Sequence, residues 1–262
     1  MVSSLARQFG RRKLLNYLKL LYIRIMGEKP LPLEFAIFLK NIAGEKIIPV
    51  EEFCVWQGKD LNNKFLKRIL FNHKFTGWSL DHLTLNFIEK YIKKHEPKRI
   101  LELGSGISTL CLARYMMETH RENRKYVISL EEDKDFVYKT KKLVSEYLGE
   151  KYAEVFYAPL RKYKVGDEEV EFYSFPKKVE ELVLEFKPDT VIIDGPRGSA
   201  RRKWSIYLIH EYISKPSVFF LDDAFRDIHI LKTWNGKEIG ENKVYVKGII
   251  PFPKGLGIGI II

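Results

Sequence analysis

The feature that most constrains the fold is a short apolar segment that runs into a glycine-rich turn, at residues 99–110 (RILELGSGISTL). The apolar residues predict a buried strand, and the residues after the turn predict a helix. Gly104 and Gly106 allow a sharp turn and a close approach of the backbone to a ligand. Hydroxyl and amide donors follow near the start of the helix: Ser105, Ser108 and Thr109. The segment therefore predicts a strand–turn–helix unit that binds a nucleotide-like cofactor.

Glu102 lies just ahead of this turn and narrows the choice of cofactor. Phosphate groups favour amide donors and positive potential, so a carboxylate here favours a cofactor that is cationic or presents hydroxyls and an amine. S-adenosylmethionine fits that description. A dinucleotide site would need a third glycine where Thr109 stands. The sequence thus disfavours a dehydrogenase.

Acidic residues also follow the next predicted strand, residues 126–130. A carboxylate at the tip of the second strand of such a unit can accept two hydrogen bonds from a ribose diol. We assign this role to Glu131. For Glu132 and Asp133 we favour another explanation, because acids stabilise the start of a helix, here the one predicted over residues 136–148.

Three more apolar runs predict strands, at residues 153–158, 190–193 and 217–221. The first is followed by a proline, the second by Asp194, and the third by the pair Asp222 and Asp223. Ligands of an open parallel sheet lie outside the carboxyl ends of its strands, so these acids are expected to converge on one crevice.

Strands that alternate with helices predict an α/β fold: a Rossmann-like, doubly wound sheet of seven strands, mostly parallel. Two closing strands, at residues 243–250 and 255–262, are joined by so short a connection that they must be antiparallel. The last strand is therefore the antiparallel one, and we expect it to be buried. Helices are predicted over residues 81–94, 108–120, 136–148, 177–186, 200–213 and 227–234.

The first 75 residues differ in composition from the rest, which predicts two parts: a basic, mainly helical N-terminal extension at residues 1–75 and the sheet domain at residues 76–262. The extension has 14 basic and 6 acidic residues and so carries +8 of the net charge of +11. Residues 4–26 predict a basic amphipathic helix that lies on an anionic membrane, contacts nucleic acid or a partner, or docks on the main domain. A second helix is predicted over residues 33–41.

Composition excludes several classes of site. Cys54 and Cys111 have apolar neighbours and no metal-ligand spacing, so we expect reduced cysteines in a cytoplasmic protein, peripheral to the membrane if the basic helix binds lipid. The six histidines are scattered and predict no zinc site. Charged residues make up 30% of the chain, which points to a thermophilic source.

Residues 76–262 resemble the class I S-adenosylmethionine-dependent methyltransferases. Residues 101–109 (LELGSGIST) are similar to the first motif of that family, Glu131 matches its ribose-binding acid, and residues 194–196 (DGP) match its fourth motif. A subgroup thought to act on sugars or other small hydroxylated molecules also has an aromatic pair, here Phe172 and Tyr173, and a DDxxR sequence, here residues 222–226. The resemblance implies that Trp78 covers the cofactor.

A narrower similarity is to metal-dependent O-methyltransferases such as catechol O-methyltransferase. It implies that Asp194, Asp222 and Asp223 hold Mg²⁺, which would bind the hydroxyls of the acceptor. The sequence departs from that pattern because Asp223 replaces an asparagine, and because Gly195 and Pro196 follow the first ligand. Asp222 has the alternative role of capping the next helix.

The expected activity is O-methylation of a small hydroxylated acceptor, such as a sugar or a glycan precursor. Asp194 or Asp223 would act as general base, or Mg²⁺ would lower the pKa of the acceptor hydroxyl. Arg226 or Arg197 would orient an anionic group of the acceptor, or else neutralise the aspartates. Two alternatives stay open: an RNA or other nucleic-acid methyltransferase that uses the basic extension, and a catalytically silent module that binds S-adenosylmethionine.

Overall fold

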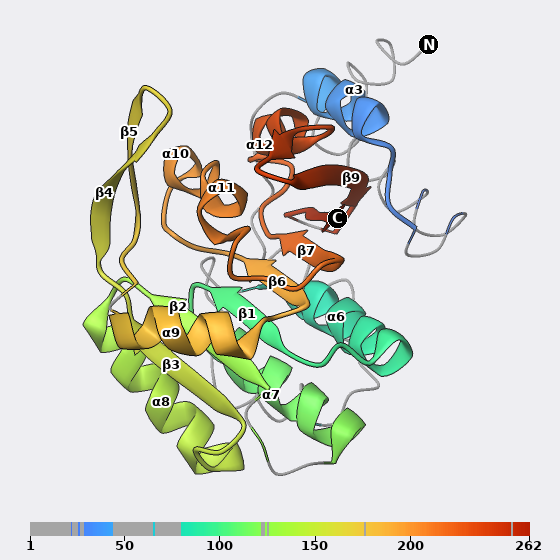
Figure 1. Cartoon of the computed structure of the whole chain (residues 1–262). Coiled ribbons are helices and arrows are strands. Elements are labelled where there is room, and N and C mark those ends of the chain that lie inside the picture. Colours follow the sequence, from blue (N-terminus) through green and yellow to red (C-terminus); the bar gives the residue numbers. More distant parts are fainter. Residues whose placement is uncertain are drawn as a thin grey trace.

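The computed structural model describes residues 22, 26, 29–43, 65, 80–121, 124, 126–175, 177–252 and 254–262. Its centre is an eight-stranded sheet in the order β3-β2-β1-β6-β7-β10-β9-β8 (Figure 1). The first five strands of that order are parallel, and β10 is antiparallel to both of its neighbours. The strands are β1 (Ile100–Leu103), β2 (Val127–Glu131), β3 (Ala153–Tyr157), β6 (Thr190–Ile193), β7 (Ser217–Leu221), β8 (Glu238–Ile239), β9 (Asn242–Ile250) and β10 (Leu256–Ile261).

Helices cover both faces of the sheet. One face packs against α6 (His82–His95), α7 (Ile107–His120) and α8 (Lys134–Leu148). The other packs against α3 (Leu33–Ala43), α9 (Lys177–Phe186), α11 (Ser205–Ile209) and α12 (Ile228–Trp234), with the short α10 (Ser199–Arg202) next to α11. This is the predicted doubly wound α/β fold, and the antiparallel last strand is confirmed as well.

Strand residues divide between two apolar cores, one on each face, because successive side chains of a strand point to opposite faces. In β1, Leu101 and Leu103 join the core under α9 and α11, whereas Ile100 joins the core under α6 and α7. In β7, Phe219 and Phe220 divide in the same way. All five side chains are fully buried. Burial on both faces explains why these strands read as continuous apolar runs.

The structure adds three strands to the seven that the sequence predicts. β8 extends the edge of the main sheet beside β9. β4 (Leu160–Val165) and β5 (Glu168–Tyr173) form a separate antiparallel hairpin that projects from the body above α9 (Figure 1). A two-residue turn, Gly166 and Asp167, joins them. That dipeptide between alternating runs is a hairpin signal, and it could have predicted the hairpin.

The single helix predicted over residues 200–213 is wrong, because two short helices, α10 and α11, occupy this segment. The break falls at Lys203, whose carbonyl oxygen accepts a hydrogen bond from the indole Nε1 of Trp234 at 2.8 Å. The side chain of Arg202, just before the break, is buried among aspartates. Both contacts come from distant segments, so local periodicity carries no signal of them.

Part of the predicted N-terminal extension packs on the sheet domain. Leu31 forms an antiparallel bridge with Ile249 of β9, with N···O distances of 2.8 and 3.0 Å. The helix predicted over residues 33–41 is confirmed as α3, and its Leu33, Ala36 and Leu39 are buried in the core. The basic helix predicted over residues 4–26 lies outside the described residues, apart from Tyr22 and Met26, which are helical. Trp78 and Cys54 also lie outside them.

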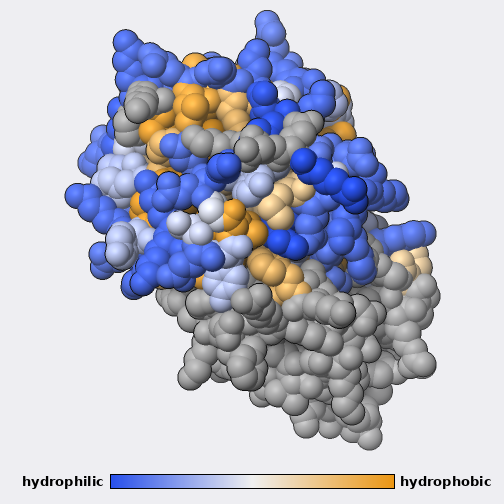
Figure 2. Space-filling view, turned by 90° about the horizontal axis from the view of Figure 1, so that it is seen from below, coloured by the Kyte–Doolittle hydropathy of each residue, from blue (hydrophilic) through white to orange (hydrophobic). Residues whose placement is uncertain are grey.

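Among the helices that the structure describes, none has the length and apolar composition needed to cross a bilayer. On the face seen from below, the described residues are mainly hydrophilic, with small apolar groups between them (Figure 2). Cys111 is buried in α7 and is a free thiol.

Candidate functional site

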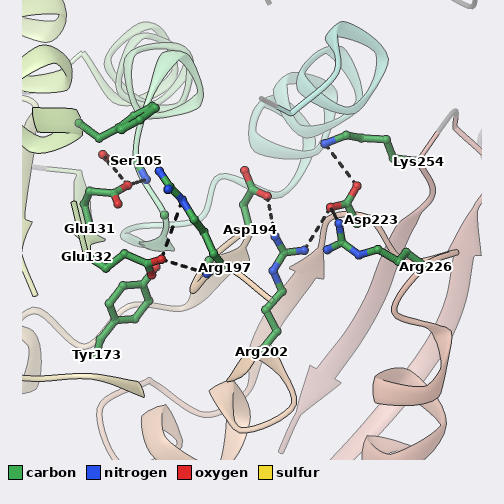
Figure 3. Close-up of a pocket in the computed structure, with 13 residues that line it drawn as sticks. Ser105, Glu131, Glu132, Tyr173, Asp194, Arg197, Arg202, Asp223, Arg226 and Lys254 are labelled. Atoms are coloured by element: carbon green, nitrogen blue, oxygen red, sulfur yellow. Dashed lines mark hydrogen bonds and ion pairs between the residues drawn. The ribbon is translucent and has the colours of Figure 1, made fainter. Parts of the chain in front are cut away.

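A pocket of about 290 Å³ opens at the carboxyl ends of the parallel strands β1, β2, β6 and β7. It lies where the strand order reverses direction, between β1 and β6, which is the usual ligand position in an open α/β sheet. Of the acids predicted to converge, Glu131, Asp194 and Asp223 line this pocket (Figure 3), whereas Asp222 lies close to Asp194 and Asp223 but does not line it. The pocket is lined by Gly104, Ser105, Glu131, Glu132, Phe136, Tyr173, Asp194, Gly195, Arg197, Arg202, Asp223, Arg226 and Lys254.

The glycine turn forms one wall of the pocket. Gly104 has φ +94°, a left-handed conformation that side chains rarely adopt. Its N–H donates to the carbonyl oxygen of Leu130 at 2.8 Å, which ties the turn to β2. A Cβ at Gly104 would lie 3.1 Å from the backbone nitrogen of Gly195, which follows β6. The turn thus lies close against the neighbouring loop, and any side chain at Gly104 would force the two apart.

Glu131, at the end of β2, faces the pocket as predicted for a ribose-binding acid. Its carboxylate accepts hydrogen bonds from the backbone N–H of Ser105 at 2.9 Å and from the Ser105 hydroxyl at 3.1 Å. A third comes from the N–H of Asp133 at 3.0 Å. Asp133 is the N-cap of α8, since its side chain accepts from the N–H groups of Asp135 and Phe136. Asp133 thus lies at the start of α8, as expected, whereas Glu132 lines the pocket.

Glu102 lies behind the turn and not in the pocket lining. Its side chain is fully buried, and Oε2 accepts a hydrogen bond from the Thr109 hydroxyl at 2.5 Å. The Thr109 oxygen in turn accepts from the N–H of Gly106 at 3.1 Å. Burial raises the pKa of Glu102 to about 7, against the opposing effect of nearby hydroxyls. Glu102 and Thr109 brace the turn, and their contact with a cofactor stays a prediction, as it does for Gly106 and Ser108.

Three carboxylates lie together on the other side of the pocket. Oxygen atoms of Asp194, Asp222 and Asp223 lie within 4.8 Å of one another. The proximity predicted for a metal site is therefore present, but cationic side chains already contact each of these aspartates. The α12 cap is Asp227 and not Asp222, so the capping role considered for Asp222 is wrong.

Two of the cationic residues, Arg202 and Lys254, were not predicted. The guanidinium of Arg202 lies 3.4 Å from Asp194, 3.3 Å from Asp223 and 3.2 Å from Asp227. The ammonium of Lys254 lies 2.6 Å from Asp222 and 3.4 Å from Asp223. Both side chains are buried, which is rare for these residue types unless they are paired. In the sequence, both stand in segments without a recognisable motif.

Arg226 neutralises aspartates of the cluster, which is one of the two roles predicted for it. It lies 2.7 Å from Asp223 and 3.1 Å from Asp227. Arg197 instead extends toward the start of α8. Its backbone N–H donates to the Glu132 carboxylate at 3.3 Å, and its guanidinium lies 3.7 Å from Asp133. The same guanidinium lies 5.4 Å from the centre of the Phe136 ring. Glu132, Phe136 and Arg197 thus frame one side of the pocket (Figure 3).

Burial and charge shift the proton affinities of these groups. Burial, reinforced by the charge of Asp222, raises the pKa of Asp194 to about 7, while Arg202 and Lys254 oppose the rise. Burial also raises the pKa of Asp222 above its ordinary value. For Lys254, burial lowers the pKa, but the carboxylates of Asp222, Asp223 and Asp194 outweigh it and leave the pKa raised. Lys254 is therefore a fixed positive charge near neutral pH.

Comparison with known proteins gives similarities of structure only. No protein-family model matches the chain, and no curated protein matches its sequence. Many solved structures share its fold, and all those described here are methyltransferases.

An O-methyltransferase from Bacillus cereus, in complex with S-adenosylhomocysteine, aligns with a TM-score of 0.53 and 13% identity over 80% of this chain and 96% of that one. A methyltransferase from Podospora anserina, bound to the same molecule, has a TM-score of 0.55 and 14% identity over 82% and 97%. The O-methyltransferase TomG from Streptomyces achromogenes, in complex with S-adenosylmethionine, has a TM-score of 0.50 and 12% identity over 80% and 94%. The chain therefore has the fold of the class I methyltransferases.

Proposed function

We propose that this protein is an S-adenosylmethionine-dependent O-methyltransferase that acts on a small hydroxylated acceptor, such as a sugar or a glycan precursor. One observation carries the proposal: the glycine turn, Glu131 and Asp194 converge on a single pocket at the carboxyl ends of the strands. The ligands bound to proteins of the same fold support the choice of cofactor, because two of those structures contain S-adenosylhomocysteine and one contains S-adenosylmethionine.

Glu131 is the proposed contact of the cofactor ribose. A carboxylate can accept about four hydrogen bonds, and Ser105 and Asp133 supply three to Glu131. A ribose hydroxyl can take the remaining position, and a second can replace the Ser105 hydroxyl. The backbone of Gly104 and Ser105 would lie against the rest of the cofactor, because no side chain intervenes at Gly104.

Asp194 is the proposed general base. When bound, S-adenosylmethionine supplies an electrophilic methyl group and leaves as a neutral thioether. The acceptor oxygen that forms the new bond to carbon must lose its proton, and a carboxylate oxygen of Asp194 can take it. Asp223 is less suited, since three cations contact it, at 2.7, 3.3 and 3.4 Å. Among the described residues, Asp194 has one such contact, at 3.4 Å.

Cofactor binding is the direct test. We expect the full chain to bind S-adenosylhomocysteine in a calorimetric titration, with Gly104→Arg and Glu131→Ala weakening the affinity by at least about 10-fold. Gly104→Arg places a side chain where the turn meets Gly195, and Glu131→Ala removes the ribose acceptor. Glu150→Ala, at an exposed acid outside the pocket, is the matched control. Equal affinity in all four proteins would reject the site.

Turnover separates an enzyme from a silent binding module. Purified protein with S-adenosylmethionine labelled in its methyl group should transfer label to members of a panel of sugars and phenols. Binding of the cofactor without transfer to any hydroxylated acceptor would instead support the silent module.

A further inference from the structure

Lys254 lies in the loop between β9 and β10, and backbone hydrogen bonds join this loop to the one that carries Asp222 and Asp223. The carbonyl oxygen of Lys254 accepts a hydrogen bond from the N–H of Phe225 at 3.1 Å. The carbonyl oxygen of Gly255 accepts from the N–H of Ala224 at 3.0 Å. The side chain is only 5% exposed. Hydrogen bonds of the loop backbone and burial of the side chain therefore hold the Lys254 ammonium in place.

The ammonium lies between the pocket and Asp222. Lys254, Asp194 and Asp223 line the pocket, whereas Asp222 does not, and the Asp222 side chain has no exposed surface. Lys254 Nζ lies 2.6 Å from Asp222 Oδ2 and 3.4 Å from Asp223 Oδ1. Figure 3 shows the contact with Asp223. A divalent ion that used all three carboxylates would have to take the place of the ammonium.

The donor set itself supports this conclusion. Metal ions such as Mg²⁺ bind carboxylates that are free to coordinate and keep several waters around the ion. Here Asp222 Oδ2 contacts an ammonium, and Asp194 Oδ1 and Asp223 Oδ2 contact the guanidinium of Arg202. Asp222 Oδ1 is buried without a hydrogen-bond partner among the described residues, and Asp222 does not line the pocket. The three carboxylates, as arranged, do not fit a divalent metal.

We propose that Lys254 is the resident cation of this site and stands where a divalent ion held by Asp194, Asp222 and Asp223 would otherwise lie. The pocket then needs no divalent ion. The role of Lys254 in the reaction, where it supplies the positive charge next to the acceptor, rests on the proposed methyltransferase function. The exclusion of a divalent ion by Lys254 concerns the aspartate cluster alone.

The test measures Mn²⁺ binding by electron paramagnetic resonance, with the full chain and no cofactor added. We expect no stoichiometric binding by the wild type. Lys254→Ala removes the ammonium, leaves room for an ion and exposes both Asp222 oxygens, so it should gain about 10-fold or more in Mn²⁺ affinity, a scale known for groups that adjoin metal ligands. Lys254→Arg keeps the charge and should bind no better than the wild type.

Two further variants test whether a gain in Mn²⁺ affinity comes from the aspartate cluster. Asp222→Asn, combined with Lys254→Ala, should abolish the gain. Lys162→Ala breaks a lysine–carboxylate pair elsewhere, with Glu169 on the hairpin at 2.7 Å, and should gain no Mn²⁺ affinity.

Stoichiometric Mn²⁺ binding by the wild type that Asp223→Asn removes would overturn the proposal, whether or not the Lys254 variants fold. A folded Lys254→Ala protein that gains no affinity would overturn it too. Failure to bind S-adenosylhomocysteine in a separate titration would reject the proposed function and leave the Mn²⁺ result standing. The two conclusions can therefore fail independently.

Discussion

Among single residues, Glu102 combines full burial with a carboxyl oxygen, Oε1, that has no hydrogen-bond partner among the described residues. Burial raises its pKa to about 7 from an ordinary value of 4.5. Between these two pH values the folded protein keeps the proton while the unfolded chain has lost it. The free energy of unfolding therefore falls as pH rises through this window, and this contribution levels off above pH 7.

The first prediction concerns Glu102→Gln, which has nearly the same shape and does not ionise. Between pH 4.5 and 7.5 the wild type should lose up to roughly 3 kcal/mol of stability through Glu102, and the variant should lack that part of the slope. Urea unfolding at several pH values measures it. Glu118→Gln, at an exposed ion pair in α7, serves as control. Parallel pH profiles for wild type and Glu102→Gln would contradict the prediction.

A second prediction follows from Asp194. Its pKa is raised to about 7, and a general base acts only when deprotonated, so the rate of methyl transfer should rise as pH passes through about 7 and then level off. Asp194→Asn should lower kcat by about 100-fold or more while S-adenosylhomocysteine still binds. Single-turnover rates from pH 5.5 to 9 give the profile. A flat profile, or full activity in the variant, would exclude Asp194 as the base.

The sequence predicts residues such as Glu131 and Asp194 because each ends or directly follows a buried strand, and strand ends are brought together by the fold class alone. Arg202 and Lys254 could not be predicted in this way. Their partners lie 8 to 32 positions away, and contact depends on how one loop crosses another. Sequence periodicity contains no information on that crossing.

At the scale of elements, the β4–β5 hairpin is joined to the pocket through one aromatic residue. Tyr173, the last residue of β5, is buried and lines the pocket. A Cβ at Gly195 would lie 2.0 Å from its hydroxyl and 3.0 Å from the backbone nitrogen of Gly104. The hairpin, the loop after β6 and the glycine turn thus meet at Gly195, where only hydrogen leaves enough space.

The third prediction is that Gly195→Ala destabilises the protein by about 1–3 kcal/mol, the range found for overpacking, and weakens S-adenosylhomocysteine binding. Tyr173→Phe removes the hydroxyl that the new methyl group would strike, so the double variant should recover part of both losses. The recovery is incomplete because the contact with Gly104 persists. Denaturant unfolding and calorimetry of the four proteins form a double-mutant cycle, and strictly additive effects would contradict the contact.

Central strands that form apolar runs, and helices with strong amphipathic periodicity, could be predicted from the sequence to within about two residues, as β6, β7 and α9 show. The hairpin was missed because its exposed strands are rich in charge, with Arg161, Lys162, Glu168 and Glu169 among them. Such strands lack the apolar run that identifies a central strand. The α10–α11 break was missed because its cause, the Trp234 contact, lies 31 positions away.

At the scale of the whole molecule, the segment around Leu31 ties the N-terminal part of the chain to the far half of the sheet. Leu31 exchanges two backbone hydrogen bonds with Ile249, and α3 packs against β9 and α12. A Cβ at Gly248 would lie 2.0 Å from the Leu31 carbonyl oxygen. The division into an extension and a sheet domain stays a prediction, with residues 29–43 packed on the sheet domain.

The fourth prediction tests that attachment. Gly248→Ala should push the Leu31 segment away from β9, so that the Ile249 amide exchanges its hydrogen faster and the protein loses about 2 kcal/mol more stability than a control variant does. Gly236→Ala is the matched control, because Gly236 also has a positive φ, +76°, but has open space around its Cβ position. Equal effects of the two substitutions would show that backbone strain alone is responsible.

Three expectations for the whole molecule stay predictions: binding of a membrane or nucleic acid by residues 4–26, a cytoplasmic location, and a thermophilic source. Co-sedimentation of the full chain with anionic liposomes, compared with a chain that begins at Glu28, addresses the first. Equal binding by both would leave the basic helix with a structural role.

The position of β10 in the sheet has a consequence for synthesis of the protein. β10 pairs with β7 on one side and β9 on the other, although both precede it in the chain. As the polypeptide leaves the ribosome, the edge of β7 is therefore exposed, and β9 cannot join the parallel strands until the residues of β10 have been translated. Lys254 lies two residues before the start of β10, so the nascent chain completes the charge network around Asp222 only at this late stage.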